Sequence, residues 1–96
     1  MLATLILNHA TATATCRCLS ALVPEMPSGA CIFVLDNGSP GEDSRQLADF
    51  ASQHQEKIHF SSSLKNLGFA GGMNLLMGQV LANPRFFRLD EKWIFS

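Results

Sequence analysis

Three short polar stretches contain residue types that can bind a small molecule through hydrogen bonds. Asn8 and His9 follow one apolar run, the DNGS stretch at 36–39 follows another, and KNLGFAGGMN occupies 65–74. A carboxylate just past a buried strand, such as Asp36, can accept hydrogen bonds from a base or a ribose. The other interpretation is that Asp36 only caps a turn through its own backbone, and position alone leaves both open.

The glycine-rich stretch offers a second kind of chemistry. Its glycines let the backbone approach a ligand closely, and a helix that starts after them would offer free N–H groups to an anion such as a diphosphate. The alternative is a tight strand-to-helix connection with Phe69 buried in the core. The stretch matches neither G-x-G-x-x-G nor G-x-x-x-x-G-K-[ST], which argues against a dinucleotide or ATP site.

Histidines and cysteines are the other reactive side chains. His9 could stack on a base or titrate, and the alternative is a satisfied residue at the rim of a sheet. Cys16 and Cys18 would lie on different sides of a helix, so they cannot chelate one ion together. Three cysteines without metal-ligand spacing predict neither a disulfide framework nor a zinc site.

The order of apolar runs and turn formers predicts the scaffold that positions these stretches. Strands are expected at 2–8, 31–36, 57–62 and 92–96, and helices at 11–22, 43–55 and 71–83. This alternation predicts an α/β fold, a Rossmann-like parallel sheet of about four strands with right-handed crossovers and helices on both faces. Ligands bind at the carboxyl ends of such strands, so all three polar stretches are expected at one rim.

The predicted helices also have expected ends and buried faces. Thr11 is expected to cap the first helix, and Pro84 to end the third. Buried positions are expected at Leu47, Phe50 and Ala51 in the second helix and at Leu75, Leu76, Val80 and Leu81 in the third.

Composition limits the function further. The 96 residues form one small domain, 1–96, with a net charge of −1 and 16% charged residues, which implies no basic surface for nucleic acid. No apolar run approaches the roughly 20 residues of a transmembrane helix. The opening MLATLIL lacks a charged leader and a cleavage signal, so it is interpreted as a strand. With reduced thiols, these features favour the cytoplasm.

Three segments together resemble a known family. LILNHA, FVLDNGSPGEDSRQLADF and KNLGFAGGMNLLM are similar, in order and spacing, to the amino-terminal part of family 2 glycosyltransferases with the GT-A fold, most closely the rhamnosyltransferase-type members. The resemblance covers nearly the whole chain. It implies an inverting, metal-dependent transfer of a sugar from a nucleotide-diphosphate donor to a glycan, lipid-linked or small acceptor.

The resemblance also implies roles for individual residues. Asn8, His9 and Asp36 would hold the nucleoside. Asn66 and the Gly68–Gly72 loop would lie near the ribose and diphosphate, and Asn74 would steady that loop at the start of its helix. The implied nucleotide-sugar-binding set is Asn8, His9, Asp36, Asn37, Asn66, Gly68, Gly71, Gly72 and Asn74.

Three departures from the family pattern matter. Ala10 stands where the family usually has an asparagine, and PGED replaces the usual aspartate, so Glu42 or Asp43 would cap the next helix. In the family, a strand like KWIFS leads into an Asp-rich motif that holds a divalent ion, Mg²⁺ or Mn²⁺. Here Ser96 is the last residue, and Asp90 and Glu91 precede that strand.

The resulting hypothesis is a truncated glycosyltransferase, its donor-binding half, with no catalytic residues, no bound metal and no turnover of its own. A longer enzyme of this type could be membrane-peripheral. The alternatives are a non-catalytic nucleotide-binding or assembly module that acts through a partner chain, and an unrelated α/β domain whose glycine loop is structural. A homo-oligomer is also expected, with the carboxyl-terminal segment, including Phe86, Phe87, Trp93 and Phe95, buried against a second copy.

Overall fold

The computed structural model describes residues 2–83. Its strands are β1 (Ala3–Asn8), β2 (Cys31–Asn37) and β3 (Ile58–Ser63). Its helices are α1 (Ala12–Leu22), α2 (Asp43–Ser52) and α3 (Gly68–Ala82), and a short 3₁₀ helix, η1 (Val23–Glu25), follows α1. The predicted fourth strand at 92–96 and the segment proposed for association lie outside the described residues.

The three described strands form one parallel sheet with β2 in the centre. Asn8 of β1 pairs with Asp36 of β2, and Asp36 pairs with Ser62 of β3, so all three strands end at the same edge. All seven residues of β2 are buried, as expected for a central strand covered on both faces. The predicted α/β class with a parallel sheet is confirmed, and the arrangement is consistent with a Rossmann-like fold.

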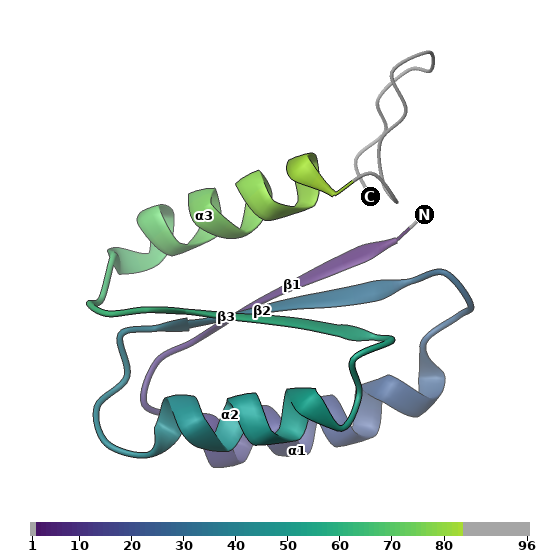
Figure 1. Cartoon of the computed structure of the whole chain (residues 1–96), viewed down its shortest axis with the longest axis horizontal. Coiled ribbons are helices and arrows are strands. Elements are labelled where there is room, and N and C mark those ends of the chain that lie inside the picture. The colour runs from purple at the N-terminus through teal and green to yellow at the C-terminus, as the bar shows by residue number, and fades with distance from the viewer. Residues whose placement is uncertain (1, 84–96) are drawn as a thin grey trace.

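The helices cover both faces of the sheet, as predicted. Helices α1 and α2 contact each other and lie on one face, while α3 lies on the other face across β1 and β2 (Figure 1). Two successive crossovers on the same face carry the chain across the sheet in one direction, from β1 to β2 to β3.

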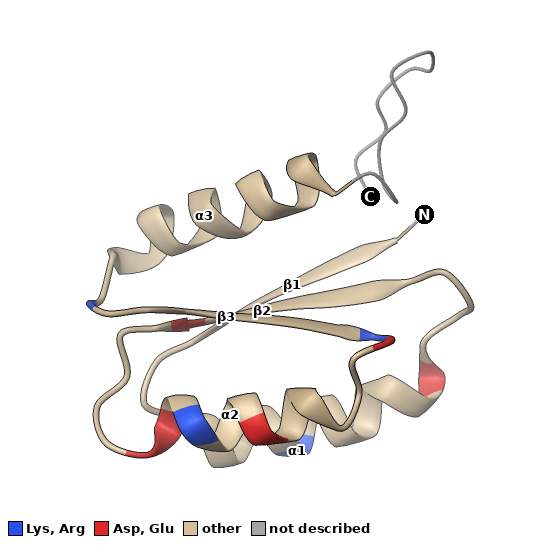
Figure 2. Ribbon diagram, viewed as in Figure 1, with Lys and Arg blue, Asp and Glu red and all other residues tan. Residues whose placement is uncertain are grey.

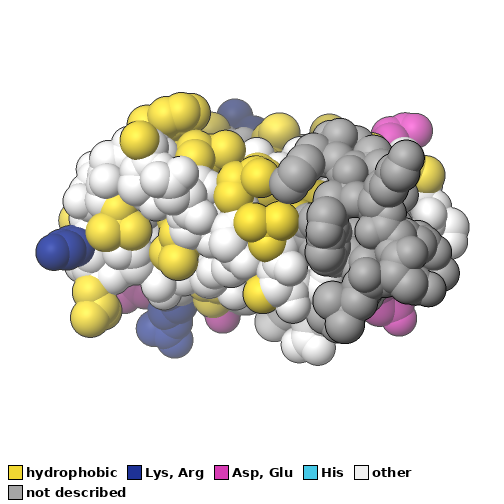
Figure 3. All heavy atoms as spheres, turned by 90° about the horizontal axis from the view of Figure 1, so that it is seen from above, with side chains coloured by type: hydrophobic (Ala, Val, Ile, Leu, Met, Phe, Trp, Pro, Cys, Tyr) yellow, Lys and Arg dark blue, Asp and Glu magenta, His cyan; other side chains and the backbone are white. Residues whose placement is uncertain are grey.

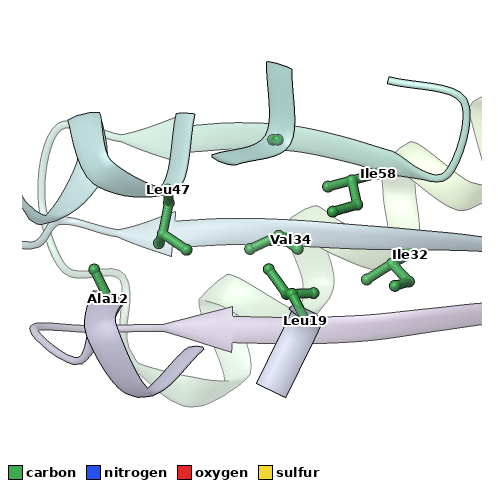
Figure 4. Close-up of a cluster of buried hydrophobic side chains, with 7 residues drawn as sticks. Ala12, Leu19, Ile32, Val34, Leu47 and Ile58 are labelled. Carbon is green, nitrogen blue, oxygen red and sulfur yellow. The ribbon is translucent and has the colours of Figure 1, made fainter. Parts of the chain in front are cut away.

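Each face has its own hydrophobic cluster because side chains alternate along a strand. On the α1 and α2 face, Ile32 and Val34 of β2 pack with residues of the two helices and with Ile58 (Figure 4). On the other face, alternate β2 side chains pack against Leu76 and Val80 of α3. The predicted burial of Leu47 and Ala51 is confirmed, at 1% and 6% exposure.

Helix α3 differs from its prediction in two ways. It begins at Gly68 rather than at 71, so the expected glycine loop is its first turn. Its buried residues, Gly72, Leu76 and Val80, are four positions apart and form a single narrow stripe. Leu75 and Leu81 lie off that stripe and are 41% and 49% exposed, so their predicted burial is wrong.

Charge is distributed unevenly between the two faces. Helix α3 contains no Lys, Arg, Asp or Glu, whereas α1 carries Arg17 and α2 carries charged residues of both signs (Figure 2). Viewed from the α3 side, hydrophobic side chains are prominent on the surface (Figure 3). Within residues 2–83, no helix is long and apolar enough to cross a membrane.

Candidate functional site

The carboxyl ends of the three strands bring the predicted polar stretches together. We call this edge the polar rim and define it as residues 8–11, 36–39 and 65–68. The stretches are far apart in sequence, yet hydrogen bonds join the first to the second and the second to the third. The expectation that they share one rim is therefore confirmed.

Asp36 is the buried centre of the rim, with 1% of its surface exposed. Its Oδ1 accepts a hydrogen bond from Asn8 Nδ2 at 2.9 Å and a second one from the Ser39 hydroxyl. Its Oδ2 accepts one from the Ser39 main-chain N–H at 3.3 Å. The turn-capping interpretation of Asp36 is confirmed, and the carboxylate also joins β2 to β1.

Asn8 connects the same cluster to α1. Its Oδ1 accepts hydrogen bonds from the hydroxyls of Thr11, at 2.9 Å, and Thr15, at 2.6 Å. Since its Nδ2 donates to Asp36, both ends of the buried amide are used inside the protein. Asn8 thus acts as part of the frame of the rim.

The predicted helix caps are partly wrong. Thr11 does occupy the N-cap position of α1, but its hydroxyl binds Asn8 instead of a helix N–H. The first N–H of α1, that of Ala12, donates to Asp43 Oδ2 at 2.9 Å. Glu42 is at the N-cap position of α2 without a side-chain cap. Asp43, expected to cap its own helix, therefore caps α1, where a carboxylate also complements the helix dipole.

Asn37 joins β2 to the start of α3 and is only 3% exposed. Its Oδ1 accepts a hydrogen bond from the Leu67 N–H at 2.8 Å, and its Nδ2 donates to the Gly68 carbonyl at 3.0 Å. The exposed Asn66 adds a local bond, because its Oδ1 accepts the Gly68 N–H at 2.8 Å. Two side chains thus determine where α3 begins.

Two glycines of the region are explained by another part of the chain that lies too close to leave room for a side chain. At Gly38, which has a φ of +69°, a Cβ would lie 2.3 Å from both Asn66 N and Lys65 C. At Gly72, a Cβ would lie 2.6 Å from Leu7 Cδ1. These glycines let parts of the same chain approach each other. Gly38 lies outside the glycine-rich stretch, and no local sequence pattern predicts its role because its contact is with residues distant in sequence.

The other two predicted glycines have different environments. Gly68 has a φ of +75°, and no atom lies within 4 Å of a Cβ built there, so the backbone conformation explains this glycine. A Cβ at Gly71 would approach Leu67 Cβ at 3.0 Å, within the turn that starts α3. Phe69, between them, is 74% exposed, so the alternative of a buried Phe69 is wrong.

His9 is an exposed side chain at the end of β1. Its Nδ1 lies 3.0 Å from the main-chain oxygen of Asn37, so the ring is tied to β2. The next residue, Ala10, donates its N–H to the Ser39 hydroxyl at 2.8 Å and has a φ of +55°. Asparagine tolerates this left-handed conformation better than alanine does.

Asn74 does not lie where it was expected. Because α3 begins at Gly68, Asn74 is in its second turn, and its side chain is exposed. Its predicted place at the start of the helix is wrong. Asn37 and Asn66 hold the first turn instead.

The described residues provide no set of ligands that fits a divalent metal. Within residues 2–83 there is no group of three or more His, Cys, Asp or Glu side chains that could hold an ion. Burial and the nearby Asp43 carboxylate raise the pKa of the Cys16 thiol. Cys16, Cys18 and Cys31 are all free thiols.

A hollow of the described surface, lined by Leu2 and residues 27–30, lies at the amino end of the sheet, opposite the polar rim. At the rim, by contrast, His9, Lys65 and Asn66 are exposed around a buried frame.

No family model, curated protein or solved structure matches the chain. The chemistry of the rim and the resemblance of its segments are therefore the basis for a function.

Proposed function

We propose that the polar rim binds the nucleotide of a nucleotide-diphosphate sugar, and that this chain is the donor-binding part of a glycosyltransferase. One observation carries the proposal. The three segments that resemble family 2 glycosyltransferases are bonded to one another through their characteristic side chains, Asn8 to Asp36 and Asn37 to the Leu67–Gly68 backbone. The residues that carry the resemblance thus contact one another. This supports a common origin of these segments and those of the family.

The direction of the helices supports this location for the ligand. Helices α1 and α2 leave the rim toward one face of the sheet and α3 leaves it toward the other (Figure 1). In open parallel sheets, ligands bind at the carboxyl ends of strands, where connections diverge in this way. Within residues 2–83, β2 leads into α2 and its neighbour β3 leads into α3, so the connections diverge at the rim between these two strands.

The exposed groups of the rim match the parts of a nucleotide. His9 and Asn66 can hydrogen-bond a base or ribose. The first turn of the fifteen-residue α3 presents backbone N–H groups and the positive end of the helix dipole, which favour a diphosphate. Lys65, just after β3, adds a positive charge at the same rim. The buried side chains of the rim would act indirectly, by holding these exposed groups in place. They are those of Asn8, Asp36 and Asn37.

The proposal is limited to donor binding. Sugar transfer in this family would require a divalent ion and a general base, and the described residues do not fit such an ion. No catalytic residue is therefore proposed in this chain.

The test is a titration of the ¹⁵N-labelled chain with UDP, dTDP and GDP, followed by NMR. We expect saturable binding of at least one nucleotide, with the largest amide shift changes at residues 9–10, 38–39 and 65–70. Asn66→Ala should weaken binding about tenfold, because it removes a polar contact and loosens the start of α3. Gln53→Ala, at the opposite end of the sheet, should bind like the wild type. No binding at millimolar nucleotide, or shifts confined to residues 27–30, would refute the proposal.

A second candidate is a purely structural rim in a module that acts through a partner chain. The observation in its favour is that the buried Asn8 and Asp36 side chains are satisfied by other protein groups. This candidate predicts that rim variants lower the melting temperature while no nucleotide raises it. The same titration therefore separates the two.

We also propose that the chain self-associates through its carboxyl-terminal segment. In support of association, α3, which precedes that segment in the chain, is uncharged and exposes Phe69, Leu75 and Leu81 at 74%, 41% and 49%. Sedimentation of the full chain and of a chain lacking residues 86–96 tests the proposal. We expect an oligomer that is lost on truncation, and a monomeric full chain at micromolar concentration would rule the proposal out.

A further inference from the structure

We infer that His9 is held in the tautomer with its hydrogen on Nδ1, and that its Nε2 accepts a hydrogen bond from a hydroxyl or N–H group of the bound nucleotide. The ligand part of this inference rests on the proposed function. In this role the His9 ring accepts a hydrogen bond from a donor atom of the ligand. It neither stacks on a base nor binds an anion.

The tautomer follows from the chemistry of one contact. His9 Nδ1 lies 3.0 Å from the main-chain oxygen of Asn37. A carbonyl oxygen accepts hydrogen bonds and has no hydrogen to donate, so the hydrogen in this contact belongs to Nδ1. A neutral imidazole ring carries one hydrogen, so a hydrogen on Nδ1 leaves Nε2 without one.

The acceptor in this contact is held by several interactions. Asn37 is the last residue of β2, pairs in register with Ser63, and is 3% exposed. Its side chain is bonded at both ends to the start of α3. The Asn37 carbonyl is therefore part of a packed frame, and the ring bonded to it has a defined orientation.

The other ring nitrogen is available to a ligand. His9 is exposed, and within residues 2–83 the contact with Asn37 is its one described hydrogen bond. With the hydrogen on Nδ1, a neutral ring carries a lone pair on Nε2. Ribose hydroxyls and base N–H groups are hydrogen-bond donors, whereas ionised diphosphate oxygens only accept. The neutral ring therefore recognises the nucleoside part of the ligand.

The tautomer can be measured without any ligand. Two-bond ¹H–¹⁵N correlation spectra of the full-length ¹⁵N-labelled chain at pH 8.5 report the protonation of each ring nitrogen. We expect the His9 signals to show a protonated Nδ1 and an unprotonated Nε2. A dominant Nε2–H form, or an equal mixture of the two forms, would overturn the tautomer assignment.

Two substitutions separate the ligand contact from the structural one. In His9→Asn, the side-chain amide nitrogen can replace Nδ1 as the donor to Asn37, but nothing replaces Nε2. In His9→Gln, the longer side chain places a hydrogen-bonding group near the Nε2 position. His54→Asn, at the opposite end of the sheet, is the matched control.

Binding of UDP, dTDP and GDP to each full-length variant is measured by calorimetry, with the best-bound nucleotide as the probe. We expect His9→Asn to weaken binding about tenfold, His9→Gln to weaken it less, and His54→Asn to leave it unchanged. Wild-type affinity in His9→Asn, or a greater loss in His9→Gln than in His9→Asn, would show that Nε2 makes no ligand contact. Absence of binding by the wild type would overturn the proposed function and the ligand contact together, while the tautomer is decided by the spectra alone.

Discussion

At the scale of single residues, several backbone positions in and beside the polar rim have left-handed conformations. Gly38, Gly41 and Gly68 all have positive φ angles, of 69°, 66° and 75°. Ala10 has a φ of 55° although it carries a Cβ. Of these three glycines, Gly38 alone has another stretch of backbone packed directly against it, that of Lys65 and Asn66.

Gly38→Ala should therefore be far more destabilising than Gly41→Ala. Both variants place a Cβ on a left-handed backbone, which costs about 1 kcal/mol. At Gly38 the Cβ would also lie 2.3 Å from backbone atoms, whereas at Gly41 nothing lies within 4 Å. We expect Gly38→Ala to lose on the order of 3 kcal/mol or more. Urea unfolding of both variants measures the difference, and equal losses would contradict the close approach.

The three cysteines should react with iodoacetamide in a defined order. Cys18 is exposed, Cys16 is half-buried and Cys31 is fully buried. A raised pKa leaves less Cys16 thiolate at a given pH, and the thiolate is the reactive form. At pH 8 we expect Cys18 to react first, Cys16 more slowly, and Cys31 only after unfolding. Mass spectrometry of the labelled chain gives the rates.

Burial is the larger cause of the raised Cys16 pKa, and a charge variant tests the second cause, the Asp43 carboxylate. Asp43→Asn removes the negative charge that opposes ionisation of the thiol, so the Cys16 pKa should fall and its labelling at pH 8 should become faster. Asp49→Asn, on the same helix, is the control and should leave the rate unchanged. Slower labelling in Asp43→Asn would contradict the assigned cause.

At the scale of elements, helix starts are determined by side chains from other elements. Asp43, the first residue of α2, accepts the first N–H of α1. Asn37 at the end of β2 binds two backbone groups at the start of α3. Helix α1 is thereby fixed to α2, and helix α3 is fixed to the sheet, which orients the groups that surround the rim.

Gly72→Ala and Gly78→Ala should have opposite effects on stability. Alanine in a helix is about 1 kcal/mol more favourable than glycine, and Gly78 has open space around it. Gly78→Ala should therefore stabilise the chain. At Gly72 the Cβ would lie 2.6 Å from Leu7 Cδ1, so α3 or Leu7 must shift, at a net cost of about 1–3 kcal/mol.

A second substitution makes the Gly72 prediction sharper. Leu7→Val shortens the side chain that the new Cβ would meet. The double variant should be more stable than the sum of the two single effects predicts, because the two residues are in contact. Additive effects in thermal unfolding would show that α3 does not pack on Leu7.

At the scale of the whole molecule, the two faces of the sheet are covered by layers of different character. One layer consists of two helices that both carry charged residues, and the other contains the uncharged helix α3 (Figure 2). Exposed apolar surface of this kind favours association with another chain. This asymmetry leads to a prediction about solution behaviour.

The double variant Leu75→Lys/Leu81→Lys should reduce self-association with little effect on folding. Both leucines are substantially exposed, so each substitution should change the free energy of unfolding by less than about 1 kcal/mol. Light scattering at several concentrations measures association, and Gln53→Lys on the other layer controls for the added charge. A loss of several kcal/mol would mean that these leucines are covered within the folded chain.

The sequence alone determined the order of the elements and the edge at which the polar stretches meet. The apolar runs of β1 and β2 and the spacing of Leu47 and Ala51 are local patterns, and local periodicity reports secondary structure directly. Parallel strands that alternate with helices must place their carboxyl ends together. For these reasons, Asn8, Asp36 and the start of α3 could be assigned to one rim before the structure was known.

Only the tertiary structure decided what each rim residue does. Helix α3 begins at Gly68 because Asn37, about thirty positions earlier, binds its first backbone groups. Gly38 is required by the backbone at Lys65 and Asn66, and Asp43 caps a helix other than its own. The exposure of Leu75 and Leu81 likewise depends on how narrowly α3 contacts the sheet. These properties arise from contacts between residues distant in sequence, which local propensity and periodicity do not encode.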